Sequence, residues 1–219
     1  MTAHKIYLYP LWLRSWHWIN AILFLILIAT GLSMQYTGAA GWLVDANAPK
    51  NEEFLFSFRT AVTWHNVAGL LLTLNYLFYL ICNLLTPNGK YYKIQKKELL
   101  KRLYLQGRFY AYGIFKGEKH PFPVTEKDKF NPLQKVSYVL VMFGAMPLLI
   151  LSGFGLLFPE IVADRIFNVS GLVINDLIHI TMGFILSLFL VIHVYICTLG
   201  VKPSTLFKSM INGYHETDH

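Results

Sequence analysis

The segment DLIHITMGFILSLFLVIHVYICTLGVK, residues 176–202, decides the fold class of this chain. The 25 residues between Asp176 and Lys202 carry no formal charge, and about 20 such residues suffice for a helix to cross a bilayer. His179 and His193 interrupt the segment. Because 14 residues at 3.6 per turn come to just under four turns, both imidazoles lie on nearly the same helix face, roughly 21 Å apart. Ionisable groups are costly in hydrocarbon, so the pair indicates a functional site.

The composition of the whole chain is that of a membrane protein. Of its 219 residues only 14% are charged, whereas 55% are hydrophobic. Asp, Glu, Lys and Arg are absent from four windows, which are 15–44, 60–89, 136–159 and 177–201. We therefore expect an all-α integral membrane protein, a four-transmembrane-helix bundle that forms one domain over residues 1–219. The expected spans are about 11–34, 60–85, 133–158 and 175–201. The first window is too long for a signal sequence, and we expect it to be retained.

The basic residues predict the orientation of the chain. Sixteen of the 19 Lys and Arg lie in segments 1–14, 86–135 and 201–219. Since cytoplasmic loops are enriched in Lys and Arg, both termini and the long middle loop are predicted to be cytoplasmic, in a bacterial inner membrane. The net charge of +7 is thus explained by topology, which argues against nucleic acid as a partner. Membrane lipid is a partner, and contact with anionic lipid is a secondary role of these charges.

The loop between spans 2 and 3 is expected to contain a surface helix. Residues 94–115 mix Lys and Arg with Leu, Phe and Tyr, which is typical of an amphipathic helix lying on the cytoplasmic membrane surface. His120 follows in a Pro-rich stretch that is expected to be solvated, so it is not a ligand candidate. The periplasmic loop 35–59 is expected to be irregular with a short helix, and the C-terminal tail with His215 is expected to be a solvated end.

Span 3 has a well-defined predicted start. Asn131 is expected to be the N-cap, Pro132 occupies the first helical position, and Gln134 is at the third. Pro147 is expected to kink the span. The span contains no histidine, so it supplies no imidazole ligand.

The two cysteines, Cys82 and Cys197, lie within predicted spans. The chain has no C-x-x-C-H motif, which excludes covalent attachment of a c-type haem, and no cysteine pattern for an iron–sulfur cluster. We interpret both cysteines as small packing residues.

Helix direction sorts four histidines by depth. His17 comes early in the outward span 1 and His193 late in the inward span 4, which places both near the cytoplasm. His65 and His179 each lie about five residues into an inward span, near the periplasm. Two bis-histidine b-type haems, on His17/His193 and His65/His179, are the simplest use of such pairs. A single buried histidine is more often structural, zinc would need four ligands at one level, and a proton relay leaves the pairing unexplained.

Glycines accompany these histidines at helical spacing. Gly31 lies 14 residues after His17, on nearly the same face, where a flat macrocycle could approach the backbone. Close packing between helices is an equally good explanation for that glycine. Gly69 and Gly183 each follow a histidine by four residues, and Gly153 suits either role.

The motifs resemble a known family. They are residues 13–20 (LRSWHWIN), 64–69 (WHNVAG), 116–123 (KGEKHPFP), 130–135 (FNPLQK), 193–195 (HVY) and 209–214 (SMINGY). Together they are similar to the four-helix dihaem cytochrome b subunits of bacterial oxidoreductases. Those include the formate dehydrogenase gamma subunit, the nickel–iron hydrogenase cytochrome b and, most closely, the thiosulfate reductase-type cytochrome b.

The resemblance implies a ligand set and a second site. His17, His65, His179 and His193 would ligate two haems b. A quinone site would lie beside the cytoplasmic haem, with Asn131 at the position of the family's asparagine and Gln134 close by. Leu133 and Val194 depart from the glycine and glutamine that formate dehydrogenase subunits carry there.

The function expected from these observations is electron transfer. A dihaem subunit would carry electrons between a periplasmic redox partner and the quinone pool, menaquinone or ubiquinone, with no substrate chemistry of its own. The partner would be an iron–sulfur or molybdenum protein, a hydrogenase or a multihaem cytochrome c. From their positions, Arg14 and Arg59 are candidates to pair with haem propionates. The alternative is a haem-free membrane anchor, or a transporter subunit whose histidines bind protons or metal.

Overall fold

The computed structural model describes residues 4–36, 54–126, 128–200 and 203–217. Within these residues, four helices are long and apolar enough to cross a membrane. They are α1 (Leu11–Tyr36), α2 (Phe58–Leu85), the run of α4, η5 and α5 (Pro132–Leu157), and α6 (Gly171–Cys197). The expected all-α class with four transmembrane helices is therefore confirmed. The expected loop 35–59 lies mostly outside the described residues.

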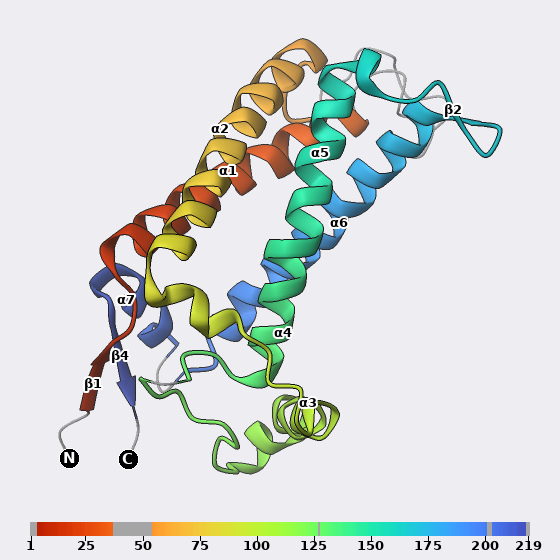
Figure 1. Cartoon of the computed structure of the whole chain (residues 1–219). Helices are drawn as coiled ribbons and strands as arrows, with labels where there is room; N and C mark the ends of the chain where they lie inside the picture. The colour runs from red at the N-terminus through yellow and green to blue at the C-terminus, as the bar shows by residue number, and fades with distance from the viewer. Residues whose placement is uncertain (1–3, 37–53, 127, 201–202, 218–219) are drawn as a thin grey trace. The chain divides into compact units, whose positions relative to one another are not determined.

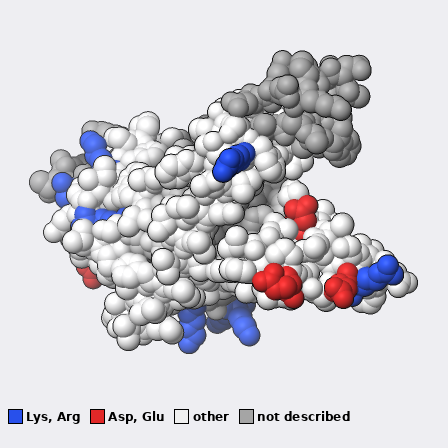
Figure 2. Space-filling view, turned by 90° about the horizontal axis from the view of Figure 1, so that it is seen from above, with Lys and Arg blue, Asp and Glu red and all other residues white. Residues whose placement is uncertain are grey.

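The surface of these helices requires an apolar solvent. Only 6% of the most apolar 18-residue window of α6 is buried inside the protein. Figure 2 shows one face of the molecule, on which most of the described surface carries neither acidic nor basic side chains. Because exposed apolar area of this extent is unfavourable in water, the helices are stable only with their outer faces in lipid.

Helix α6 begins at Gly171, four residues before its predicted start, because a short hairpin precedes it. Strand β2 (Arg165–Ile166) pairs antiparallel with β3 (Val169–Ser170). The two turn residues, Phe167 and Asn168, have positive φ angles of 48° and 64°, the backbone that a two-residue hairpin turn of type I′ requires. The Gly171 N–H donates to the Asp164 carbonyl over 3.1 Å, which closes the hairpin onto the helix.

Span 3 departs from regular helix before Pro147. Helix α4 (Pro132–Leu140) is followed by a π-helical turn, η5 (Val141–Ala145), and then by α5 (Met146–Leu157). Proline has no N–H and its ring clashes with the carbonyl four residues earlier, here that of Phe143. The wider π turn contains Phe143 and accommodates this clash, so the expected kink takes the form of a π-bulge.

The chain forms two compact units. The first comprises residues 1–14, 81–147 and 188–219, and the second comprises residues 15–80 and 148–187. In the second unit, the Trp16 ring stacks on Tyr79 with centroids 4.4 Å apart, and Tyr79 is fully buried. Asn75 Nδ2 donates to the Trp16 carbonyl over 3.3 Å. Such interhelical polar contacts hold α1 to α2 where lipid offers no hydrogen-bond partner.

In the first unit, the chain ends form a strand pair. Strand β1 (His4–Tyr7) pairs antiparallel with β4 (Tyr214–Thr217), and the two lie side by side in Figure 1. Helix α7 (Thr205–Asn212) leads into β4 through Gly213, whose φ of 89° favours glycine. The tail was expected to be a solvated end; residues 214–217 form a strand paired with β1, and Tyr214 is exposed.

The long loop between α2 and α4 contains the expected surface helix, shorter than predicted. Short helix η2 (Pro87–Tyr92) comes first, and α3 (Leu99–Arg108) continues through η3 (Phe109–Gly113) and η4 (Ile114–Lys116). Its exposed apolar residues include Leu100, Tyr104 and Phe115. An exposed apolar row beside lysines and arginines is typical of a helix that lies in the membrane interface.

Candidate haem site

The structure brings His65 and His179 together. His65 lies on α2 and His179 on α6, both in the second unit, and their ring centroids are 6.1 Å apart with planes at 72°. Two imidazoles that bind one metal ion from opposite sides place their centroids roughly 6 Å apart, because each metal–nitrogen bond is about 2 Å long. The two histidines that were paired by predicted depth therefore stand at a separation that fits bis-histidine ligation of one haem iron.

His65 is held from α1 by a buried threonine. Its Nδ1 is 3.0 Å from the Thr30 hydroxyl oxygen, and Thr30 is only 2% exposed. The same hydroxyl is 2.7 Å from the Ile26 carbonyl oxygen, to which it donates. The imidazole is thus tied through Nδ1 to the neighbouring helix.

His179 is held from α5 in the same way. Its Nδ1 is 3.1 Å from the Ser152 hydroxyl oxygen and 3.2 Å from the Leu149 carbonyl oxygen. Ser152 donates to the Leu148 carbonyl over 2.7 Å, and its own carbonyl accepts from Asn175 Nδ2 on α6 over 2.8 Å. Neither Thr30 nor Ser152 was a candidate from the sequence, because a hydroxyl in an apolar helix usually bonds only its own backbone.

The glycines divide into two kinds. A Cβ built on Gly153 would lie 3.2 Å from His179 Cε1, closer than most Cβ contacts, so this glycine makes room for the imidazole. One on Gly31 would lie 3.5 Å from His65 Cε1, which is an ordinary contact distance. A Cβ on Gly69 would meet no atom within 4 Å, and one on Gly183 would meet only Leu149 Cδ1 at 4.0 Å. Packing within the protein therefore does not require glycine at 69 or 183, one turn after each histidine.

The other two histidines lie in different units. The His17 ring on α1 meets the edge of Trp18 at 5.4 Å. The His193 ring on α6 stacks on Phe189 at 5.8 Å and meets Tyr138 of α4 at 6.1 Å. His193 Nε2 is 3.8 Å from the Cys197 sulfur. His17 belongs to the second unit and His193 to the first, and their pairing stays a prediction from the sequence.

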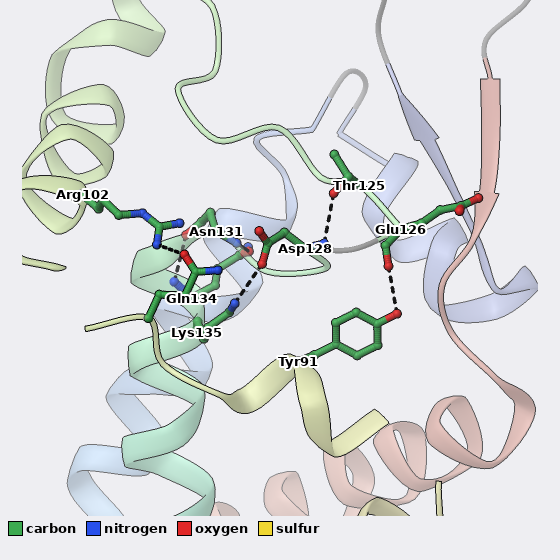
Figure 3. Close-up of polar contacts among 9 residues, drawn as sticks. Tyr91, Arg102, Thr125, Glu126, Asp128, Asn131, Gln134 and Lys135 are labelled. Carbon is green, nitrogen blue, oxygen red and sulfur yellow. Dashed lines mark hydrogen bonds and ion pairs between the residues drawn. The ribbon is translucent and has the colours of Figure 1, made fainter. Parts of the chain in front are cut away.

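The residues proposed for a quinone site form the predicted helix cap. Asn131 Oδ1 accepts from the Gln134 N–H over 2.9 Å, and Gln134 Oε1 accepts from the Asn131 N–H over 3.3 Å, which confirms the cap (Figure 3). Asn131 Nδ2 donates to the Tyr110 hydroxyl over 2.9 Å.

The Arg14 guanidinium donates to the Ile211 carbonyl and so joins α1 to α7.

Ion pairs and hydrogen bonds fasten the segment before α4. Lys135 Nζ is 3.0 Å from Asp128 Oδ1, and the Asp128 N–H donates to the Thr125 hydroxyl over 3.0 Å (Figure 3). The Tyr91 hydroxyl donates to the Glu126 carbonyl over 3.0 Å. The loop that enters span 3 is thus anchored to η2 and to α4.

Lys129 is a buried cation that sequence analysis missed. It is 1% exposed, and its ammonium donates to Asn88 Oδ1 over 3.2 Å. The ammonium lies 4.5 Å from the Tyr9 ring centroid, 5.5 Å from that of Tyr91 and 5.6 Å from that of Phe130. Burial lowers the Lys129 pKa to about 7. In the sequence, Lys129 is one of many basic residues of the 86–135 loop, and nothing in its neighbours signals an aromatic enclosure.

The buried Lys129 predicts that stability rises with pH. The folded protein binds the lysine proton with a pKa of about 7, against 10.5 for an ordinary lysine, so the unfolded chain holds more protons between these values. The free energy of unfolding should therefore increase from pH 7 to 9.5, by at most about 1.4 kcal/mol per pH unit. Burial raises the pKa of Tyr9 and Tyr110 above 10. The titration of these two groups therefore does not contribute to the change in stability between pH 7 and 9.5. Thermal unfolding in detergent should show the increase, and Lys129→Met should lose it; an equal slope in both proteins would contradict the assignment.

His120 lies in an exposed stretch, as predicted, although one side of its ring is covered. Its ring packs on Phe109 at a centroid distance of 4.8 Å, and its Nε2 is 3.4 Å from Gln106 Nε2. Burial lowers the His120 pKa.

Within the described residues, no group of three or more His, Cys, Asp or Glu side chains is placed to hold a metal ion.

The chain has four helices that can span a membrane and a pair of facing histidines on two of them. Its similarity to known proteins identifies it as a membrane b-type cytochrome that transfers electrons. The profile of the family described as "Prokaryotic cytochrome b561" matches residues 8–213, and the chain belongs to this family. It is 41% identical over 213 residues to "Putative cytochrome YdhU" of Escherichia coli (strain K12), an alignment that covers 97% of this chain and 76% of that protein. No solved structure matches the chain significantly. The expected resemblance to the cytochrome b superfamily is confirmed, and haem b is the cofactor that the family implies.

Proposed function

We propose that this multi-pass bacterial membrane protein is a dihaem cytochrome subunit that carries electrons between a redox partner at the periplasm and the quinone pool. The observation that carries the proposal is the His65–His179 pair, with ring centroids 6.1 Å apart. Each ring is bonded through Nδ1 to a hydroxyl of a neighbouring helix, which leaves both Nε2 atoms available to iron.

In this proposal, His65 and His179 hold one haem b and His17 and His193 hold the other. A bound haem takes up and releases one electron at a time. The residues of the chain fix each haem at a defined depth, exclude water from it and set its potential through the ligating imidazoles. Two centres at different depths shorten each electron step across the bilayer.

The proposed orientation places both termini and the 86–135 loop in the cytoplasm. Sixteen of the 19 lysines and arginines then lie on the cytoplasmic side, as the positive-inside rule requires. The pairing of β1 with β4 supports this arrangement, since it needs both chain ends on one side of the membrane. The His65–His179 haem is then periplasmic, where an iron–sulfur, molybdenum, hydrogenase or multihaem cytochrome c partner would exchange electrons with it.

The proposed quinone site lies at the start of α4. This region holds the buried polar side chains of Asn131 and Lys129 among aromatic rings, beside the half-buried Tyr110. In Asn131, one Nδ2 hydrogen is donated to the Tyr110 hydroxyl and Oδ1 serves the capping box, so the second Nδ2 hydrogen is the proposed donor to a carbonyl oxygen of a menaquinone or ubiquinone head group. Gln134 then contributes by keeping the cap intact.

The haem content of the purified protein tests the proposal. A pyridine haemochrome assay against protein concentration is expected to give two haems b per chain. A redox titration of the α-band is expected to resolve two one-electron steps, because the two sites differ in depth and surroundings. A content of one haem, or a difference spectrum without b-type bands, would refute the dihaem assignment.

A further inference from the structure

A repeated side-chain arrangement surrounds the His65–His179 pair. In α1 a hydroxyl residue precedes a glycine at Thr30-Gly31, and in α5 the same order occurs at Ser152-Gly153. In both cases the hydroxyl oxygen lies 3.0 to 3.1 Å from the Nδ1 of the facing histidine. In both cases the atom nearest to a Cβ built on the glycine is Cε1 of that same ring, at 3.5 Å for Gly31 and 3.2 Å for Gly153. The same arrangement occurs on two separate helix pairs, α1 with α2 and α5 with α6. Packing alone does not account for this repeat, which indicates that the hydroxyl and the glycine together hold the imidazole.

The hydrogen bonds of Ser152 and Leu149 assign the proton on His179. A carbonyl oxygen only accepts, so the 3.2 Å contact between Nδ1 and the Leu149 carbonyl requires a hydrogen on Nδ1. The Ser152 hydroxyl has one hydrogen, and carbonyl oxygens of Leu148 and Leu149 at 2.7 and 3.0 Å compete for it. The Ser152 oxygen therefore accepts from His179, and Nε2 carries the free electron pair.

The hydrogen bonds around His65 assign its proton in the same way. The Thr30 hydroxyl has one hydrogen and donates it to the Ile26 carbonyl at 2.7 Å, with the Leu27 carbonyl at 3.3 Å. Its oxygen is then an acceptor for the His65 Nδ1 hydrogen at 3.0 Å. Both histidines thus have the tautomer in which Nε2 is the ligating atom.

We infer that Thr30 and Ser152 are positioning residues that tune the haem held by His65 and His179. This inference rests on the proposed function. Each hydroxyl holds the orientation of one ligand ring, together with the Leu149 carbonyl in the case of His179, and by accepting the Nδ1 hydrogen it makes Nε2 a stronger electron donor. A stronger donor favours ferric over ferrous iron, so these two hydroxyls lower the reduction potential of this haem relative to ligands without them.

Removal of either hydroxyl should raise the midpoint of one haem. In Thr30→Val, which keeps the shape of the side chain, the His65 ring loses its hydroxyl acceptor, and in Ser152→Ala the His179 ring keeps only the Leu149 carbonyl as an acceptor for its Nδ1 hydrogen. We expect up to a tenfold shift of the ferric–ferrous equilibrium toward ferrous iron, about 59 mV for one electron. The second haem is an internal reference, because neither hydroxyl contacts its proposed ligands.

Two further variants separate hydrogen bonding from packing. Thr30→Ser restores the hydroxyl without the methyl group and should return the midpoint to the wild-type value. Ser33→Ala removes a buried hydroxyl on the same helix that donates to the Ala29 carbonyl over 2.9 Å, and it should leave both midpoints unchanged. All variants would be titrated in detergent with optical detection, which requires no partner and no turnover.

The outcomes are distinct. A raised midpoint of one haem in Thr30→Val and Ser152→Ala, restored in Thr30→Ser, supports the inference, as does haem loss in Thr30→Val that Thr30→Ser prevents. Unchanged or lowered midpoints, or equal haem loss in Thr30→Val and Thr30→Ser, overturn it while the dihaem proposal stands. Failure of the dihaem proposal itself would be seen separately, as a haem content that does not change in His65→Ala. That result would also overturn the inference about Thr30 and Ser152.

Discussion

Replacement of His65 by alanine is expected to remove one of the two haems and to leave the other. Alanine offers no nitrogen to iron, and no other imidazole among the described residues is shown as near to His179 as the His65 ring, at 6.1 Å. His179→Ala should remove the same haem, so that both variants keep the same single midpoint and the same α-band. In the proposed orientation, electron transfer from the periplasmic side should be lost in each, because the haem proposed to receive those electrons would be absent.

The measurement is a haemochrome count together with a redox titration of each purified variant. His17→Ala and His193→Ala should both lose the other haem, which would establish the pairing that lies across the two units of the structure. His120→Ala is the matched control, since His120 packs on Phe109 in the cytoplasmic loop and should leave both haems in place. Loss of both haems from a folded His65→Ala protein, or loss of different haems in His65→Ala and His179→Ala, would contradict the assignment.

Leucine at position 69 is expected to displace the haem proposed for His65 and His179 without harm to the fold. A side chain on Gly69 would meet no protein atom within 4 Å. Leucine is also preferred over glycine in a helix by roughly 0.5–1 kcal/mol, so the variant should unfold at an equal or higher temperature. The leucine side chain would nevertheless stand one turn from His65, where a macrocycle bound to that ring must approach the backbone. We expect loss of one haem of the two, the same one that His65→Ala loses.

Gly144→Leu supplies the control for this experiment. A Cβ on Gly144 likewise meets nothing within 4 Å, and Gly144 lies in the π turn of span 3, in the other unit from His65. It should retain both haems. Gly183→Leu should behave as Gly69→Leu does, because it follows His179 by the same four residues. If Gly69→Leu kept both haems with wild-type midpoints, the two glycines would be lipid-facing positions and no part of the site.

Several features of the site were predictable from short-range patterns. The Asn131–Gln134 capping box follows from residues three apart in one chain segment, and it forms as expected. The pairing of His65 with His179 followed from counting residues from each helix start, since the rise per residue of a helix is constant. The bounds of the fourth helix were less predictable, because its start depends on a hairpin whose turn residues, Phe167 and Asn168, have no strong turn signature.

Other features depend on which faces of the helices meet. Thr30 and Ser152 are ordinary residues of apolar helices until α2 and α6 bring an imidazole to 3.0 and 3.1 Å from them. Lys129 is one charge among many until Tyr9, from the far end of the chain, covers it. The strand pair of β1 with β4 joins segments more than 200 residues apart, and neither has enough apolar alternation to be recognised alone.

The sequence by itself determined the membrane class, the four spans, their predicted orientation and the heights of the histidines. These properties depend on charge, apolar length and the fixed rise of a helix, all of which are local or additive along the chain. The tertiary structure alone decided which hydroxyl holds each imidazole, which glycine makes room for it and how Lys129 is enclosed. Those contacts depend on helix rotation and on side-chain packing between distant segments, because in lipid close packing and interhelical hydrogen bonds select the faces that meet.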